Sequence, residues 1–434
     1  MPYPMHVRVA TLVLAFQLGA HLASAGEAQA QRGLVFHAPP KALPTGAVTE
    51  EWPHFLGPHH NATTRETRLL TAWPKDGPKK VWEMESGEGY ACPVFAGGRL
   101  VYFHRVAGKE TLDCLDPETG KRFWRFDYPV AYEDRYGFSP GPRSSAVIDE
   151  GRVYAAGVTA VLHCLDLKTG QVIWRRDLME EYKIPQYFFG YGPTPFVWKD
   201  RVIVNVGGKA RDGVTGTCVA AFDKATGKTL WEVEDAWGAS YASPIVARVR
   251  GREVALVVAA GESRPSVGGL LTIDPQDGKV FDRFPWRAKV YESVIAGTPI
   301  VLDERRVYIS ECYEKGGTLL EFDENLKSKQ VWTQRGFGLH WMTPLQIAGH
   351  LYGFAGRNPP DTEFKCVDAD SGKIVWSDDT RFQQEGRVNS FFRASLLQAG
   401  GRVFCLGEDG LLAEFELTPK GAVTRQRVRL FEAH

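Results

Sequence analysis

A repeated turn motif constrains the fold of this chain more than any other feature. An acid, a Gly four residues later and a Trp after a further four recur in CLDPETGKRFW (114–124), CLDLKTGQVIW (164–174), AFDKATGKTLW (221–231) and CVDADSGKIVW (366–376). Divergent copies are TIDPQDGKVFD (272–282), EFDENLKSKQVW (321–332) and EFELTPKGAVT (414–424). The seven anchor acids, 45 to 57 residues apart, are Asp116, Asp166, Asp223, Asp274, Asp323, Asp368 and Glu416. Such a period is typical of a repeat protein.

Each copy predicts four strands. Upstream of the motif, two apolar runs flank a polar turn, as in SSAVIDEGRVYAAG (144–157), which is a hairpin signature. Within the motif, the acid can accept backbone N–H groups and the Gly supplies a positive φ, so the motif is itself a turn between two further strands. The 45 Gly, 26 Pro, 12 Trp, 15 Tyr and 24 Phe also favour many short strands and tight turns. We therefore predict an all-β fold, a seven-bladed β-propeller of four-stranded antiparallel blades. An eighth blade, built from the N-terminal segment and residues 419–434, is the alternative.

The Trp of the motif has a predicted structural role. An aromatic side chain on the outer strand of each blade can lie across the neighbouring blade and bury on the order of 150 to 250 Å². We expect this inter-blade packing from Trp82, Trp124, Trp174, Trp231, Trp332 and Trp376. Asp282 stands in the Trp place of the fourth copy, so that junction should be the least well packed. Residues 81–83 look like an outer strand without the rest of its blade, and we expect it to pair with the last blade and close the ring.

The N-terminus is typical of a secretory signal. A basic start, an apolar stretch of about 15 residues and the small residues Ala23–Ser24–Ala25 predict cleavage after Ala25. The alternative is a retained N-terminal anchor, and no later segment is long and apolar enough to span a membrane. We divide the chain into a signal peptide (1–25), an N-terminal extension or strap (26–78) and the propeller (79–434). The predicted location is periplasmic or extracellular.

Charge and reactive side chains exclude several classes of function. The 52 Lys and Arg balance the 52 Asp and Glu, so nucleic acid is not an expected partner. The seven Cys include no Cys-x-x-Cys pair, which excludes zinc-finger and thioredoxin-type sites, and their odd number leaves at least one free thiol. His54, His59 and His60 have no acidic or Cys partner at fixed spacing, so we expect no metal site. Residues 137–141 read Gly-x-Ser-x-Gly but stand in a Pro-containing loop, which does not suit a nucleophile elbow.

The repeated Asp-x-x-Thr-Gly-Lys-x-x-Trp motif over residues 91–434 resembles the pyrroloquinoline-quinone (PQQ) repeat of the quinoprotein alcohol dehydrogenase-like propellers. The segment EWPHFLGP (51–58) is similar to the strap that precedes the propeller in many exported PQQ-binding-like proteins. The resemblance implies a fold and a repeat family, because the motif residues build blades and do not build a site.

Two functional groups of the family bear on this chain. The dehydrogenases oxidise alcohols or sugars with PQQ and calcium, generally with an Asp base and often with two adjacent Cys. This chain has no Cys–Cys pair, and no Asn, Glu and Asp set matches the calcium ligands. The propeller lipoprotein of the outer-membrane barrel-assembly machinery has the same repeat, binds no cofactor and acts as a scaffold. This chain lacks that protein's lipid-bearing Cys.

The candidate site lies in the loops that lead from one blade to the next, because these meet around the propeller axis and loops commonly carry function. They contain residue types common in binding hot spots. The predicted ligand-binding residues are Tyr90, Arg143, Tyr191, Tyr241, His340, Trp341, Phe392 and Arg393. The alternative is that these side chains only plug the channel.

The sequence therefore favours a non-catalytic scaffold of the cell envelope that binds a protein or a small ligand through its loop-rich face, with no catalytic residue, metal or cofactor assigned. One alternative is a PQQ- and calcium-dependent alcohol or sugar dehydrogenase. A further alternative is a scaffold subunit of outer-membrane barrel assembly.

Overall fold

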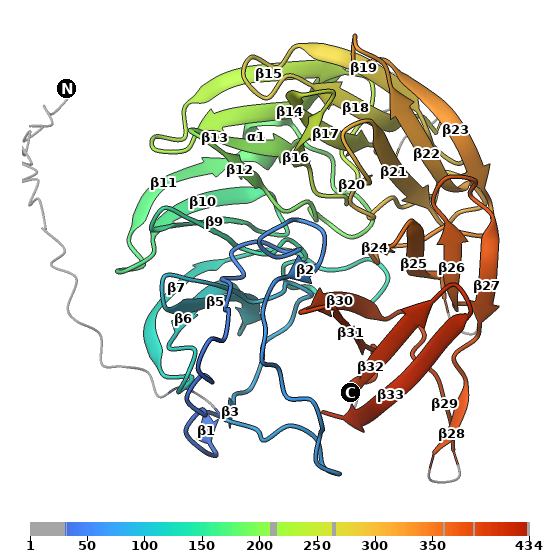
Figure 1. Ribbon diagram of the computed structural model, residues 1–434. Coiled ribbons are helices and arrows are strands. Elements are labelled where there is room, and N and C mark those ends of the chain that lie inside the picture. Colours follow the sequence, from blue (N-terminus) through green and yellow to red (C-terminus); the bar gives the residue numbers. More distant parts are fainter. Residues whose placement is uncertain are drawn as a thin grey trace, which may run out of the picture.

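The protein forms a ring of four-stranded antiparallel sheets, as predicted, in a computed structural model (Figure 1). The structure describes residues 31, 33–208, 215–262, 266–358, 361–384 and 387–431, so the predicted signal peptide lies outside the described residues. Within these ranges, seven sheets contain four consecutive antiparallel strands each, and one of them gains a fifth, parallel strand. The all-β propeller prediction is thus confirmed, and each motif copy lies between the third and fourth strands of its blade.

The strands of the first four blades follow the chain in order from the innermost to the outermost. Blade 1 is β4 (Val94–Ala96), β5 (Arg99–Val106), β6 (Lys109–Leu115) and β7 (Arg122–Pro129). Blade 2 is β8 (Val147–Asp149), β9 (Arg152–Ala156), β10 (Val161–Asp166) and β11 (Val172–Asp177). Blade 3 is β12 (Phe196–Trp198), β13 (Arg201–Asn205), β14 (Gly216–Asp223) and β15 (Thr229–Asp235). Blade 4 is β16 (Ile245–Val249), β17 (Arg252–Ala259), β18 (Gly269–Ile273) and β19 (Val280–Pro285).

The remaining blades keep the same order. Blade 5 is β20 (Ile300–Val301), β21 (Arg306–Glu311), β22 (Gly316–Phe322) and β23 (Ser328–Gln334). Blade 6 is β24 (Leu345–Ile347), β25 (His350–Ala355), β26 (Glu363–Asp368) and β27 (Ile374–Asp378). Blade 7 is β30 (Ser395–Ala399), β31 (Arg402–Leu406), β32 (Leu411–Thr418) and β33 (Gly421–Arg429). A short hairpin, β28 (Phe382–Gln384) and β29 (Arg387–Asn389), precedes blade 7.

Helix is almost absent. The helix α1 (Leu178–Tyr182) follows blade 2, and the Asp177 side chain accepts a hydrogen bond from the backbone N–H of Glu180 at its start. Over the described ranges, no helix is long and apolar enough to cross a membrane.

In the blades that have the motif Trp, this side chain lies on the turn of the next blade. The Trp124 ring covers Gly170, where an added Cβ would approach it to 2.6 Å, and its Nε1 donates to the Leu167 carbonyl at 2.9 Å. Equivalent Nε1 bonds reach a backbone carbonyl beside the next blade's anchor acid; the pairs are Trp82–Pro117, Trp174–Lys224, Trp231–Pro275, Trp332–Ala369 and Trp376–Thr418. Each anchor thus combines apolar contact with one hydrogen bond.

The junction without a motif Trp is filled in another way. The Asp282 carboxylate accepts hydrogen bonds from the backbone N–H and the hydroxyl of Ser328 in blade 5. Beside it, Phe281 and Leu326 are both buried in one hydrophobic cluster that spans blades 4 and 5. Polar contacts from Asp282 thus stand where the other junctions have a Trp ring, and the expectation that this junction is the least well packed stays a prediction.

The N-terminal segment fills an eighth sector between blades 7 and 1 (Figure 1). In its outer part, β3 (Trp82–Glu83) pairs with β1 (Val35–Phe36), so the prediction that residues 81–83 pair with the last blade was wrong. In its inner part, Trp52 bridges to Phe95 of blade 1, and β2 (Thr63–Thr64) joins β30 of blade 7 in parallel. Residues 421–429 form the outer strand of blade 7, so among the described residues the strands of the eighth sector come from the N-terminal segment.

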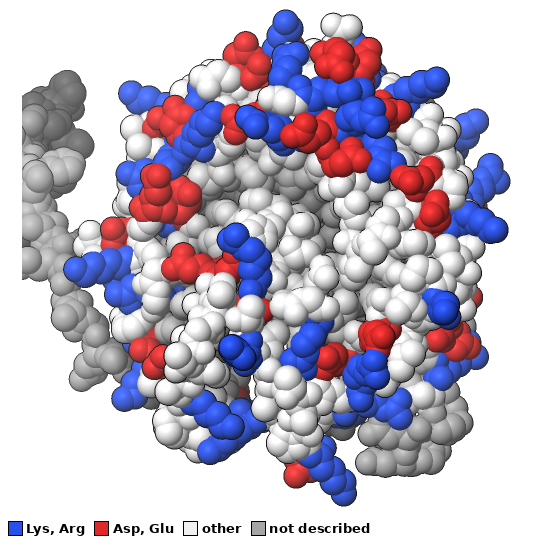
Figure 2. All heavy atoms as spheres, in the orientation of Figure 1, with Lys and Arg blue, Asp and Glu red and all other residues white. Residues whose placement is uncertain are grey.

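The same N-terminal segment closes one end of the central channel. His54, Phe55, Leu56 and His60 line a hollow together with residues 194–196, 243–245 and Thr298, which lie at or just before the start of the inner strands β12, β16 and β20. The His54 and His60 ring centroids are 4.3 Å apart, and His60 also packs on Phe196 at 4.6 Å. Figure 2 shows charged side chains around the rim of the ring and a hollow at its middle with uncharged walls.

Candidate functional site on the loop-rich face

The antiparallel blades place two kinds of connection at opposite ends of the ring. The motif turns lie at one end, together with the turns between the first and second strands of each blade. The connections between blades lie at the other end, together with the turns between the second and third strands of each blade. We call this second end the loop-rich face. Its six inter-blade connections are residues 130–146, 178–195, 236–244, 286–299, 335–344 and 379–394.

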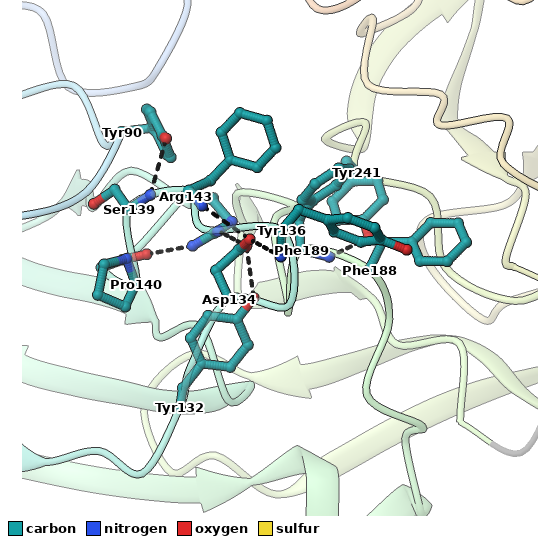
Figure 3. A network of polar contacts seen from close by, with 12 residues as sticks. Tyr90, Tyr132, Asp134, Tyr136, Ser139, Pro140, Arg143, Phe188, Phe189 and Tyr241 are labelled. Carbon is teal, nitrogen blue, oxygen red and sulfur yellow. Dashed lines mark hydrogen bonds and ion pairs between the residues drawn. The ribbon is translucent and has the colours of Figure 1, made fainter.

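Asp134 fixes the loop between blades 1 and 2. Its Oδ1 accepts the backbone N–H of Tyr136 at 2.9 Å and of Phe138 at 3.1 Å, while its Oδ2 accepts Arg143 Nη2 at 2.7 Å and the Tyr132 hydroxyl at 3.2 Å (Figure 3). The Asp134 side chain is almost fully buried. Because both oxygens are satisfied from within one loop, the loop is held in a single conformation.

This fixed loop presents two aromatic side chains to solvent. Tyr136 is 57% exposed and Phe138 is 54% exposed, and Tyr90 beside them is 55% exposed. The Tyr90 hydroxyl accepts the backbone N–H of Ser139 at 3.1 Å, and the Arg143 guanidinium lies 5.6 Å from the centre of the Tyr90 ring (Figure 3). Exposed aromatic side chains on a rigid support are typical of a binding surface.

The exposed rings belong to an aromatic belt that crosses the loop-rich face. We define the belt as Tyr136, Phe138, Phe188, Phe189, Tyr241, Tyr291, Tyr313, His340 and Trp341. Ring centroids along it are 5.4 to 5.8 Å apart from Tyr136 and Phe138, through Phe188 and Phe189, to Tyr241 and Tyr291. Tyr291 and Tyr313 pack in one hydrophobic cluster, and His340 then contacts Tyr313 at 5.5 Å and Trp341 at 4.0 Å. The far end, Trp341, is 43% exposed.

The structure places the eight predicted ligand-binding residues at two depths. Tyr90, Arg143, Tyr241, Trp341, Phe392 and Arg393 are exposed or half-buried on the loop-rich face. Tyr191 and His340 lie beneath it, because the Tyr191 hydroxyl donates to the Asn205 carbonyl inside blade 3 and His340 is packed between Tyr313 and Trp341. Tyr191 is only 3% exposed. The predicted set therefore falls into a group around Tyr90 and Arg143 and a second around Trp341 and Arg393.

Sequence reasoning missed the middle and the first end of the belt. Aligning the repeats on the inner strand selects one position in each loop, whereas Tyr136, Phe138 and Phe188 lie several residues upstream in loops of unequal length. The density of aromatic residues in YEDRYGF (132–138) and YKIPQYFFGYG (182–192) was the available signal.

Buried carboxylates support the loops from below. Glu262 accepts the backbone N–H of Phe188 at 2.8 Å and the Tyr241 hydroxyl at 2.7 Å. Glu311 likewise accepts the backbone N–H of Ala288 at 2.9 Å and the Ser293 hydroxyl. Glu110 accepts the backbone N–H of Val158 at 2.8 Å and the Tyr128 hydroxyl at 2.6 Å. Burial raises the pKa of all three carboxyl groups.

These carboxylates do not fit the calcium and PQQ of quinoprotein dehydrogenases. A calcium ion takes six to eight oxygen ligands. In the described ranges, no three His, Cys, Asp or Glu side chains come together in a group that could hold a metal. Glu110, Glu262 and Glu311 stand in different blades, and each is already engaged by a backbone N–H and a hydroxyl. These carboxylates therefore act as hydrogen-bond acceptors that support the loops.

The seven Cys are free thiols, and five of them are buried. Burial raises the pKa of Cys114 and Cys164 to about 11 and that of Cys312 to about 12. High thiol pKa values oppose thiolate chemistry. The five buried thiols therefore act as small apolar side chains.

The ring of blades, linked by a repeated acid–Gly–Trp turn, defines a β-propeller of the PQQ-like repeat class. A family model described as "Outer membrane protein assembly factor BamB" matches residues 108–378, which is more than half of the chain. The protein therefore belongs to this family, and the predicted resemblance is confirmed. No curated protein sequence matches the chain.

Solved structures share the fold at low sequence identity. The quinohemoprotein alcohol dehydrogenase from Comamonas testosteroni is 15% identical over 87% of this chain and 73% of its own, with a TM-score of 0.61. A europium-containing methanol dehydrogenase is 12% identical over 88% of this chain and 86% of its own, with a TM-score of 0.59. BamB from Moraxella catarrhalis is 15% identical over 79% of this chain and 86% of its own, with a TM-score of 0.52. Dehydrogenases and an assembly factor thus share this propeller.

Proposed function

We propose that this protein is an exported, non-catalytic β-propeller that binds an envelope protein or a ligand through its loop-rich face. The observation that carries the proposal is the aromatic belt, whose ends are exposed and whose first loop is fixed by Asp134. Exposed aromatic surface costs free energy in water, and a rigid display lowers the entropy lost on binding. The signal-like N-terminus supports export, and the family described as an outer membrane protein assembly factor supports a place in the envelope.

The support for a non-catalytic role comes from the polar groups beneath the belt. Glu110, Glu262 and Glu311 hold backbone N–H groups and hydroxyls, and their oxygens are therefore not placed to act on a substrate. A general acid or base must reach the reacting proton within about 3 Å or through one water. The alternative, a dehydrogenase with PQQ and calcium, requires ligands that these carboxylates do not supply.

The experiment compares capture by the wild-type protein and by the double variant Tyr136→Ser/Phe138→Ser. Residues 26–434 are immobilised and incubated with a cell-envelope extract from the producing organism. We expect the double variant to lose at least about tenfold of the bound material, because exposed aromatic anchors dominate binding energy. The matched control is Phe123→Ser, an exposed aromatic on the outer strand β7. Equal capture by all three proteins would show that the loop-rich face is not the binding surface.

A further inference from the structure

We propose that the aromatic belt binds an extended acidic polysaccharide, one whose sugar rings carry carboxylate groups. This inference rests on the proposed function, because it names the ligand class of the same face. Three features of the belt support it: its length, the guanidinium groups beside it and the engaged backbone N–H groups of its loops.

The belt has two exposed ends on the loops of different blades, and Phe188, Tyr313 and His340 are buried between them. A sugar ring has apolar C–H faces that pack on aromatic side chains, and a chain of sugars repeats this contact along its length. Tyr136 and Phe138 lie at one exposed end and Trp341 at the other. Ring contacts run from Tyr136 to Tyr291 and from Tyr313 to Trp341, and a ligand that reaches both exposed ends must be elongated.

Two guanidinium groups stand beside the Trp341 end of the belt. Arg357 lies 4.5 Å from the centre of the Tyr313 ring, and Arg393 lies 4.8 Å from that of Trp341. Arg135 is exposed next to Tyr136. Arg393 is paired with Glu408 at 2.6 Å. Arg357 hydrogen-bonds the Tyr313 hydroxyl and the charge of Arg135 acts on Glu262, but neither Arg forms an ion pair within 4 Å among the residues that the structure describes. A guanidinium stacked on a ring keeps its N–H edge available for a carboxylate.

The backbone of the belt loops leaves little for a peptide ligand to pair with. Peptides that extend a sheet need free N–H and C=O groups along an edge. Here the N–H groups of Tyr136 and Phe138 bond Asp134, that of Ser139 bonds Tyr90, and those of Phe188 and Phe189 bond Glu262 and Tyr241. Recognition on this face therefore depends on aromatic rings and guanidinium groups. These are complementary to the C–H faces and the carboxylates of an acidic sugar chain.

The test measures binding of residues 26–434 to three soluble probes by isothermal titration calorimetry at low salt. The probes are an oligouronate, a neutral gluco-oligosaccharide of similar length and a polyglutamate peptide. We expect saturable binding of the oligouronate, at least about tenfold weaker binding of the neutral oligosaccharide and no saturable binding of polyglutamate. Tyr136→Ser/Phe138→Ser should weaken oligouronate binding by at least about tenfold.

Charge variants separate a specific site from general attraction. Arg357→Gln should reduce the preference for the oligouronate over the neutral probe. Arg305→Gln, an exposed Arg in the turn between β20 and β21 at the opposite end, should leave that preference unchanged. Absence of saturable oligouronate binding, tighter binding of polyglutamate, or equal loss in both Arg variants would overturn the inference. If the oligouronate measurements give one of these results while envelope capture still depends on Tyr136 and Phe138, only the ligand class is wrong and the proposed function stands.

Discussion

At the scale of single residues, the glycine of the repeated turn meets two demands at once. Gly170 has φ of +73°, a conformation that costs an L-residue roughly 1 to 2 kcal/mol, and it also lies directly under the Trp124 ring. Gly151, in another turn of the same blade, has φ of +75° but no atom within 4 Å of the place where a Cβ would stand. Substitutions at Gly151 and Gly170 can therefore separate the effect of backbone strain from that of inter-blade packing.

We expect Gly151→Ala to lower the free energy of unfolding by about 1 kcal/mol and Gly170→Ala to lower it by about 3 kcal/mol or more, because the second methyl group displaces the Trp124 ring. Urea denaturation of both variants measures the difference. Equal losses would show that the Trp contact contributes nothing beyond the strain of the turn.

Asp134 is the single side chain that fixes the belt's exposed end. In Asp134→Ala, the backbone N–H groups of Tyr136 and Phe138 lose their acceptor, so their hydrogen exchange should accelerate by at least about tenfold. Oligouronate binding should weaken, because the loop must then be ordered when the ligand binds. Glu133→Ala, an exposed neighbouring carboxylate, is the control and should change neither quantity. Unchanged exchange at both amides in Asp134→Ala would contradict the assigned role.

At the scale of elements, the N-terminal segment has a half-buried pair of imidazoles where it closes the channel. Burial lowers the pKa of His54 to about 4, against an opposing attraction from Asp149. Burial, together with the positive charge of neighbouring His54 and His59, lowers the pKa of His60 to about 3. The unfolded chain, with a His pKa near 6.5, binds more protons than the folded protein below that pH. These two groups therefore do not reduce the free energy of unfolding above about pH 6.5. Below that pH they reduce it progressively as the pH falls toward 4 and 3.

We therefore expect the melting temperature to fall between pH 6.5 and 4, and to fall less in His54→Phe/His60→Phe. His37→Gln, a histidine that directly follows β1 and pairs with Glu83 outside the channel, should follow the wild type. Differential scanning calorimetry at several pH values provides the measurement. Parallel curves for the wild type and the double variant would contradict the proposed burial cost.

The elements could be predicted from the sequence because their signals are local. The anchor acid, Gly and Trp fix the third strand, the turn and the fourth strand of each blade within 11 residues, and the upstream apolar runs give the first two strands. The pairing of β1 with β3 joins residues almost 50 positions apart and has no comparable local signal. The belt was only partly predictable for a similar reason, because the contacts of Tyr136 with Phe188 and of Tyr313 with His340 depend on how unequal loops fold over the face.

At the scale of the whole molecule, seven complete blades leave an eighth sector that N-terminal residues fill. The ring is closed by the bridge between Trp52 and Phe95, the parallel pairing of β2 with β30, and the buried side chains of Leu56 and Ala62. The closure is therefore a property of residues 50–64, and β1 is peripheral to it.

We expect a variant that begins at residue 69 to melt well below the wild type, with faster hydrogen exchange in β4 and β30, because both inner strands lose a partner. A control that begins at residue 46 lacks β1 but keeps the inner segment, and it should lose much less stability. Similar melting temperatures for the two truncated proteins would contradict the role given to residues 50–64.

The cofactor question also belongs to the whole molecule. A ligand at about 100 times its Kd adds roughly 2.7 kcal/mol of stability. We expect PQQ with calcium to leave the melting temperature unchanged, because the carboxylates of the loop-rich face are engaged by N–H groups and hydroxyls. A saturable rise in melting temperature with both components, absent with calcium alone, would favour the dehydrogenase alternative.

The central claim is that the aromatic belt is the surface through which this propeller binds. Its most direct test places a photo-cross-linking amino acid at position 136 or 341 and, as a control, at position 123 on the outer strand β7, and irradiates the protein in its native envelope. We predict discrete cross-linked species from positions 136 and 341 and none from position 123. Cross-links from position 123 alone, or the same species from all three positions, would contradict the account.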